Sequence, residues 1–127
     1  MTAYNGALAP PSLSYPRSGL GGVMSADEAH GGTYSIRITG GGYRDIFYGC
    51  AAGSTTITVW VLAPVIGKCG IQVFDGQEIQ GEDWNSGAGA WEQLSITFTA
   101  LKKVYTVRLI NATIQDGDTR AYFDDLV

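Results

Sequence analysis

The sequence predicts an all-β protein, an antiparallel β-sandwich of the jelly-roll type with about eight or nine strands. Short segments alternate apolar and polar residues, the period-two pattern of a strand with one buried face. Turn residues separate these segments at intervals of about ten residues, which is typical of a sandwich. No window has the three-to-four spacing of an amphipathic helix. The 18 glycines are scattered without a period of three, which favours many tight turns over a fibrous repeat.

The first 22 residues are rich in proline and glycine. Three prolines within residues 10–16 interrupt strand pairing, and Gly19, Gly21 and Gly22 close the segment. We therefore expect an N-terminal arm over 1–22 and a sandwich over 23–127. Met24–Ala29 is expected to form one helical turn at most.

The strands are expected in regular succession along residues 34–127. Thr55–Leu62 is the strongest prediction, because it is rich in β-branched residues and Pro64 follows it. The others are Tyr34–Ile38, Asp45–Tyr48, Gly70–Phe74, Glu92–Thr99, Val104–Ile110 and the closing segment Ala121–Val127. Alternation predicts an inward-facing set of Ile36, Ile38, Ile57, Val59, Val61, Ile71, Val73, Leu94, Ile96, Phe98, Val107 and Leu109.

Composition limits the classes of partner. The 127 residues suffice for one domain with its own core, and the formal net charge is −4 with a pI near 4.7. An acidic chain lacks the basic footprint that binding to nucleic acid or to an anionic membrane surface requires. No apolar run has transmembrane length, and the start has neither the basic region nor the apolar core of a signal peptide. Cys50 and Cys69 are either a disulfide or two buried apolar residues.

The closing segment carries two adjacent carboxylates, Asp124 and Asp125, within an apolar strand. Adjacent strand residues point to opposite faces, so one aspartate is expected to face inward or toward a sheet edge. A buried carboxylate needs a cation or several N–H donors. Two interpretations remain open, a structural calcium site and a closing strand held by hydrogen bonds.

Four segments together resemble the calcium-containing β-sandwich carbohydrate-binding modules that are attached to xylanases and glucanases. They are Gly32–Ile38, Ser54–Val61, Trp91–Phe98 and Phe123–Leu126, in the order that the modules have. The resemblance covers about residues 30–127 and implies a jelly-roll sandwich that binds glycans. In those modules an early glutamate binds calcium, but no acid follows Asn5-Gly6 here, so Asp124 and Asp125 are the remaining candidate calcium ligands.

Five residues are candidate glycan contacts. Trp84 lies in the polar, glycine-rich segment Gln80–Gly87, which is expected to be a loop; the indole is either a binding platform or a plug of a surface groove. Trp60 alternates away from the buried residues of its strand and either stacks on a sugar or is covered by other parts of the chain. By the same alternation, Arg37, Phe74 and Arg108 are expected to share an outer face with Trp60.

Catalytic machinery is not expected. The only histidine, His30, has no apparent nucleophile partner, and Asp124 and Asp125 diverge too much to flank one glycosidic bond. The sequence contains no phosphate loop, no metal-spaced cysteine and histidine set and no nucleophile elbow.

Two functions remain. The preferred expectation is a structural or attachment protein of a virion surface, such as a phage decoration or fibre protein, made without a signal peptide. In it, residues 1–22 and the sheet edges would contact other protein subunits, and the domain would also contact cell-surface glycan. An initiator methionine and a chain that ends on its closing strand favour this expectation. The alternative is the glycan-binding module of a secreted glycoside hydrolase.

Overall fold

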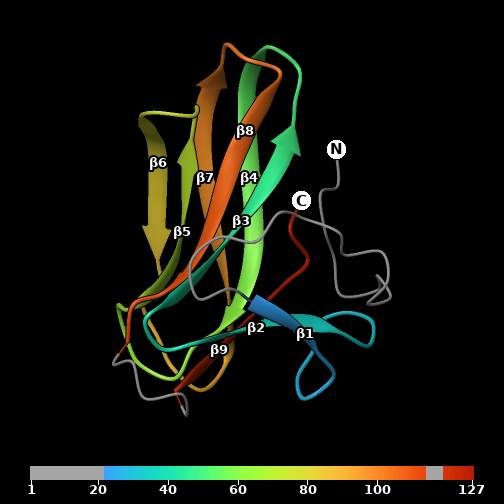
Figure 1. Cartoon of the computed structure of the whole chain (residues 1–127), viewed down its shortest axis with the longest axis vertical. Coiled ribbons are helices and arrows are strands. Elements are labelled where there is room, and N and C mark those ends of the chain that lie inside the picture. Colours follow the sequence, from blue (N-terminus) through green and yellow to red (C-terminus); the bar gives the residue numbers. More distant parts are fainter. Residues whose placement is uncertain (1–21, 114–118) are drawn as a thin grey trace.

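The computed structural model describes residues 22–113 and 119–127, with only the backbone of 22–24. Nine strands in the described residues form two antiparallel sheets that pack face to face (Figure 1). The five-stranded sheet has the order β1-β2-β9-β4-β7, and the four-stranded sheet has the order β3-β8-β5-β6. The strands are β1 (Gly22–Ser25), β2 (Ser35–Thr39), β3 (Gly42–Gly49), β4 (Gly53–Leu62), β5 (Cys69–Phe74), β6 (Ile79–Trp84), β7 (Trp91–Ala100), β8 (Val104–Asn111) and β9 (Arg120–Asp124). The predicted β-sandwich is confirmed.

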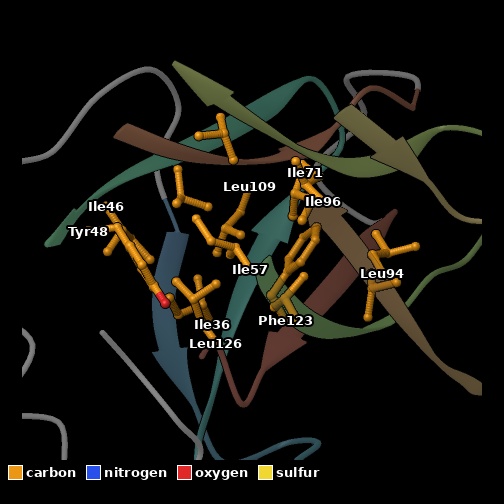
Figure 2. Close-up of a cluster of buried hydrophobic side chains, with 14 of the residues drawn as sticks. Ile36, Ile46, Tyr48, Ile57, Ile71, Leu94, Ile96, Leu109, Phe123 and Leu126 are labelled. Atoms are coloured by element: carbon orange, nitrogen blue, oxygen red, sulfur yellow. The ribbon is translucent and has the colours of Figure 1, made fainter. Parts of the chain in front are cut away.

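The core lies between the two sheets. All twelve residues predicted to face inward are buried, and each is at most 8% exposed. Phe123 on β9 and Leu126 just beyond it join the same cluster (Figure 2). Because β9 lies between β2 and β4, the last residues of the chain complete the middle of the five-stranded sheet. Val127 continues this pairing, since its N–H and C=O both bond Thr58 of β4.

Two strands form where the sequence predicted none. The helical turn expected within Met24–Ala29 is wrong at its start, because β1 pairs with β2 there. The loop expected over Gln80–Gly87 is wrong over its first half, because β6 pairs with β5 from Ile79 to Trp84 across an irregularity at Val73 and Phe74. Both strands lie at a sheet edge, and neither shows a long apolar alternation in its sequence.

The remaining sequence predictions concern the two cysteines, the N-terminal arm and membrane-spanning segments. Cys50 and Cys69 are free thiols, and Cys69 is part of the core. The N-terminal arm lies outside the described residues apart from Gly22, which begins β1. The part of the chain that the structure describes has no helix long and apolar enough to cross a membrane.

Asn111 connects the two sheets from the end of β8. Its side chain is fully buried, and its amide nitrogen donates to the carbonyl oxygens of Ile38 at 2.8 Å and Thr119 at 3.1 Å. Its amide oxygen accepts from the hydroxyl of Thr113 at 2.7 Å. Asn111 and Thr113 belong to an Asn-Ala-Thr glycosylation sequence. In the folded protein the side-chain nitrogen of Asn111, which would carry the sugar, is buried and donates two hydrogen bonds, so it is inaccessible to glycosylation.

Candidate functional site

The outer side of the four-stranded sheet gathers aromatic and polar side chains. Alternation on each strand directs every second residue away from the core. We call this surface the aromatic face; it consists of Tyr43, Asp45, Phe47, Gly70, Gln72, Phe74, Ile79, Glu82, Trp84, Thr106, Arg108 and Ile110.

Strand register arranges the aromatic face in three rows that cross the strands. One outer row contains Tyr43, Ile110, Gly70 and Trp84. The middle row contains Asp45, Arg108, Gln72 and Glu82. The other outer row contains Phe47, Thr106, Phe74 and Ile79. A polar row therefore runs between two rows rich in aromatic and apolar groups. Phe47 and Ile79 are 54% and 48% exposed, unusually high for apolar residues of strands.

Arg108 is the centre of the middle row. Its Nε and Nη2 donate to the two carboxylate oxygens of Asp45 at 2.7 and 3.0 Å, a bidentate pair. Its guanidinium carbon lies 4.3 Å from the ring centroid of Tyr43 and 5.0 Å from that of Phe74. Hydrogen bonding to Asp45 raises the pKa of Arg108 above its ordinary value, in opposition to the lowering effect of burial. Two aromatic rings and one cation therefore form one cluster across β3, β8 and β5.

Trp84 lies over the backbone of β5 at Gly70. A methyl group placed on Gly70 would be 2.7 and 2.8 Å from the indole atoms Cε3 and Cδ2. Gly70 is buried although it lies on the outer side of the sheet, because the indole covers it. The indole N–H donates to Glu82 two residues earlier on β6, at 2.6 Å. Glycine at position 70 and the bond to Glu82 together hold one indole face against the sheet.

Asn85 fixes the chain immediately after Trp84. Its side chain is buried, accepts from the N–H of Cys69 at 2.9 Å and donates to the carbonyls of Val65 at 2.8 Å and Gly87 at 2.7 Å. Its own N–H donates to the carbonyl of Cys69 at 2.8 Å. One side chain thus connects the loop before β5 with the loop after β6, and it immobilises the end of β6 that carries Trp84.

Trp60 and Arg37 lie on the opposite side of the molecule. Both project from the outer side of the five-stranded sheet, on β4 and β2 respectively. The expectation that they share a face with Phe74 and Arg108 is wrong, because alternation fixes the face of a strand and not the sheet that contains it. Phe74, Arg108 and Trp84 do come together. Arg37 instead bonds Asp27 at 3.3 Å.

The imidazole of His30 covers Trp60. The two rings stack with centroids 4.0 Å apart and an interplanar angle of 13°. Trp91 meets the same imidazole edge-on at 5.5 Å. His30 Nδ1 lies 2.8 Å from an oxygen of Asp125. Trp60 therefore matches the second of its two interpretations, an indole covered by another part of the chain, and His30 has a packing role that the sequence did not reveal.

Asp124 is fully buried beneath the same loop. Its side chain points to the outer side of the five-stranded sheet, opposite to Phe123, and the peptide N–H groups of His30 and Gly31 bond one oxygen at 2.7 and 2.9 Å. The N–H of Asp125 bonds the other oxygen at 2.8 Å. Burial raises the pKa of Asp124, and these N–H donors lower it by less than burial raises it.

Calcium prefers six to eight oxygen ligands. In residues 22–113 and 119–127, no group of three or more Asp, Glu, His and Cys side chains is arranged to hold a metal ion. The neighbours of Asp124 are N–H donors, which suit a carboxylate and not a cation. The geometry fits a closing strand held by hydrogen bonds, and calcium at Asp124 and Asp125 stays a prediction.

The sequence did not single out several residues of the aromatic face, among them Tyr43, Asp45, Phe47 and Gln72. A usable signal existed in the segment Gly42–Gly49, where tyrosine, aspartate and phenylalanine alternate with Arg44, Ile46 and Tyr48. The pairing of Asp45 with Arg108, 63 residues later, depends on the neighbouring positions of β3 and β8 and has no local signal.

The fold is similar to that of solved carbohydrate-binding modules. A structure of TmCBM61 in complex with β-1,4-galactotriose has a TM-score of 0.64 and 16% sequence identity over 96% of this chain and 95% of that one. A CBM36-1 domain of a multidomain xylanase from the hindgut metagenome of Trinervitermes trinervoides has a TM-score of 0.62 and 16% identity, over 89% and 88%. A CBM36 module in complex with calcium and xylotriose has a TM-score of 0.53 and 18% identity, over 84% and 97%.

No protein-family model matches the sequence, and no curated protein matches it. The chain has the β-sandwich fold of carbohydrate-binding modules, as its sequence resemblance implied. At identities of 16–18% the similarity establishes the fold and leaves function to the site.

Proposed function

We propose that this chain is a non-catalytic glycan-binding module and that the aromatic face is its binding surface. The supporting observation is the polar row between two aromatic rows. Sugar rings have apolar faces that pack on aromatic rings and hydroxyl groups that bond polar side chains. Asp45, Gln72 and Glu82 supply acceptors, and Gln72 and Arg108 supply donors. Four strands at about 4.8 Å spacing give the polar row a length of about 14 Å, sufficient for a short oligosaccharide.

The two outer surfaces of the sandwich differ in how their aromatic residues are used. On the five-stranded sheet, the ring of His30 stacks on Trp60 and its backbone N–H bonds Asp124. On the four-stranded sheet, Phe47 is 54% exposed, and Tyr43 and Phe74 present ring surface beside Arg108. Contiguous apolar and aromatic side chains beside polar ones mark binding surfaces, so the aromatic face is the better candidate.

Affinity electrophoresis of the native protein tests this proposal against neutral β-1,4-glucan, xylan, galactan and mannan. We expect retardation by at least one polymer. Phe74→Ala should weaken that binding by more than about tenfold, the effect of removing a central aromatic contact. Tyr122→Ala is the matched control, because Tyr122 is a half-buried aromatic residue on the outer side of the other sheet. Equal losses in both variants, or no retardation by any polymer, would refute the proposal.

The biological setting is a separate question. The virion role predicted from the sequence depends on residues 1–22 and on the sheet edges, and no observation on the described residues favours it. A module of a secreted glycoside hydrolase is the setting that the similar structures favour, since the CBM36-1 domain belongs to a xylanase. Both settings stay predictions: a virion protein made without a signal peptide, and a module of a secreted enzyme. The genes that adjoin this one test them, because capsid and tail genes support the first and hydrolase genes the second.

A further inference from the structure

We infer that the aromatic face takes uncharged glycan chains and rejects chains that carry carboxylate or sulfate groups. The inference depends on the proposed glycan-binding function and specifies the class of ligand. It follows from the state of Arg108, from the net charge of the face, and from the way in which Glu82 is bound.

Arg108 has the only positively charged side chain among the residues that form the aromatic face. A free arginine would attract uronic acids and sulfated sugars, since its fork of donors fits carboxylate and sulfate groups. Here Asp45 already occupies the edge formed by Nε and Nη2, at 2.7 and 3.0 Å. The guanidinium carbon also lies over the rings of Tyr43 and Phe74. One of the guanidinium edges that form bidentate pairs is thus filled by a carboxylate of the protein, and that carboxylate also cancels the positive charge that would attract a ligand anion.

The remaining donors of Arg108 suit hydroxyl groups. A guanidinium has five N–H groups, and Asp45 takes two of them. The others can each donate to a sugar oxygen. Because Asp45 neutralises the guanidinium, these N–H groups gain less from a charged acceptor than those of an unpaired arginine would, and neutral hydroxyl and ring oxygens satisfy them. Arg108 is therefore a donor to neutral ligands although it carries a charge.

The net charge of the aromatic face also opposes anions. Asp45 and Glu82 contribute two negative charges and Arg108 one positive charge, so the middle row has a formal charge of −1. Glu82 accepts the indole N–H of Trp84 at 2.6 Å, which keeps its carboxylate beside the platform. The whole chain, this row included, has a formal net charge of −4. The charges of a polyanion bound to this face would lie closer to these carboxylates than the screening length of about 10 Å at 0.1 M salt, so salt would only partly screen the repulsion.

Matched polymers test the inference. The hexose polysaccharide of the panel that the protein binds most tightly, whether glucan, galactan or mannan, is compared with its own derivative oxidised to carboxylate at C6, which has the same backbone; xylan has no C6 and is not used in this comparison. We expect the native protein to bind the oxidised polymer at least about tenfold more weakly than the neutral one. The loss of one hydrogen bond, or one charge repulsion of similar size, corresponds to about that factor. The dissociation constants for the neutral and the oxidised polymer should lie closer together at 300 mM salt than at 50 mM, because screening increases.

Asp45→Asn gives the sharpest comparison, because it removes the charge that neutralises Arg108 at its Nε and Nη2 edge and retains the size of the side chain. We expect its affinity for the oxidised polymer to rise by about tenfold. The matched control is Asp27→Asn, which removes one negative charge in the loop between β1 and β2, where Asp27 bonds Arg37 of the other sheet at 3.3 Å. Melting temperatures of both variants verify that they are folded.

The outcomes separate the two proposals. Equal affinity of the native protein for the neutral and oxidised polymers overturns the inference and leaves the proposed function standing. Equal gains in Asp45→Asn and Asp27→Asn also overturn it, since total charge and not Arg108 would then govern selection. If neither polymer binds, the proposed function fails and the inference fails with it.

Discussion

Gly70→Ala is the substitution that best links the stability of the fold to the binding surface. The added methyl group would lie 2.5 Å from the carbonyl oxygen of Asp83 and 2.7 Å from Cε3 of Trp84. Both distances are below 3.0 Å, closer than a Cβ atom approaches a non-bonded heavy atom in folded proteins. The nearest atom is backbone of the paired strand, so relief requires a shift of β6 or a displacement of the indole. Overpacking of this kind costs about 1–3 kcal/mol.

The reduced freedom of the unfolded chain offsets part of that cost, about 0.4–1 kcal/mol for a glycine-to-alanine change. The net expectation is a destabilisation of about 1–2 kcal/mol. For a domain of this size, that corresponds to a fall in melting temperature of roughly 3–10 °C. Since the indole can no longer lie on β5, glycan affinity should also fall, by about tenfold.

Differential scanning calorimetry and affinity electrophoresis measure the two effects. Gly87→Ala is the control, because its added methyl group would meet only Glu92 Oε1, at 3.9 Å. We expect it to leave stability and affinity close to those of the native protein. A Gly70→Ala variant with unchanged melting temperature and unchanged glycan affinity would refute the packing of Trp84 on Gly70.

Three further predictions concern stability. Asn111→Ala should lower the free energy of unfolding by about 2–4 kcal/mol in urea titrations, because it leaves buried carbonyl groups without a donor; a loss below about 0.5 kcal/mol would contradict that role. Burial raises the pKa of Glu92, but the hydrogen bonds from Ser86 and Gly87 together lower it by more than burial raises it. The pKa of Glu92 is therefore below its ordinary value. Its contribution to stability is present above the unfolded pKa and lost as pH falls through the lower folded pKa, so the stability difference between native protein and Glu92→Gln should shrink below about pH 4.5. A constant difference from pH 7 to 3 would exclude this. A calcium chelator separates the two interpretations of Asp124: hydrogen bonding by peptide N–H groups predicts an unchanged melting temperature, and a structural calcium ion predicts a fall.

The sequence predicted the core well because burial on one side of a strand leaves a local pattern. Ile57, Val59 and Val61 illustrate this: β-branched residues at period two define both the strand and its inner face. β6 shows the limit. Its inward positions are Gly81 and Asp83, which lie close to Ile96 and to the N–H of Ser95, so the segment has no apolar alternation. It becomes a strand through its pairing with β5.

The binding surface was only partly predictable for the same reason. Phe74 and Arg108 were recognised as outward residues, and so were Trp60 and Arg37, but strand order assigns the two pairs to different sheets. Strand order depends on pairings between residues far apart in the chain, such as those of β9 with β2 and β4. Trp84 was recognised as a candidate platform, although it was expected in a loop and belongs to a strand.

Amide chemical-shift mapping by NMR is the most direct test of glycan binding by the aromatic face. The isotope-labelled native protein would be titrated with an oligosaccharide of the neutral polymer that it binds. Binding at the aromatic face predicts shift changes in β3, β8, β5 and β6, centred on Arg108, Gln72 and Trp84, with little change around Trp60 and Arg37. Changes confined to the outer side of the five-stranded sheet, or to the loops at either end of the sandwich, would contradict it.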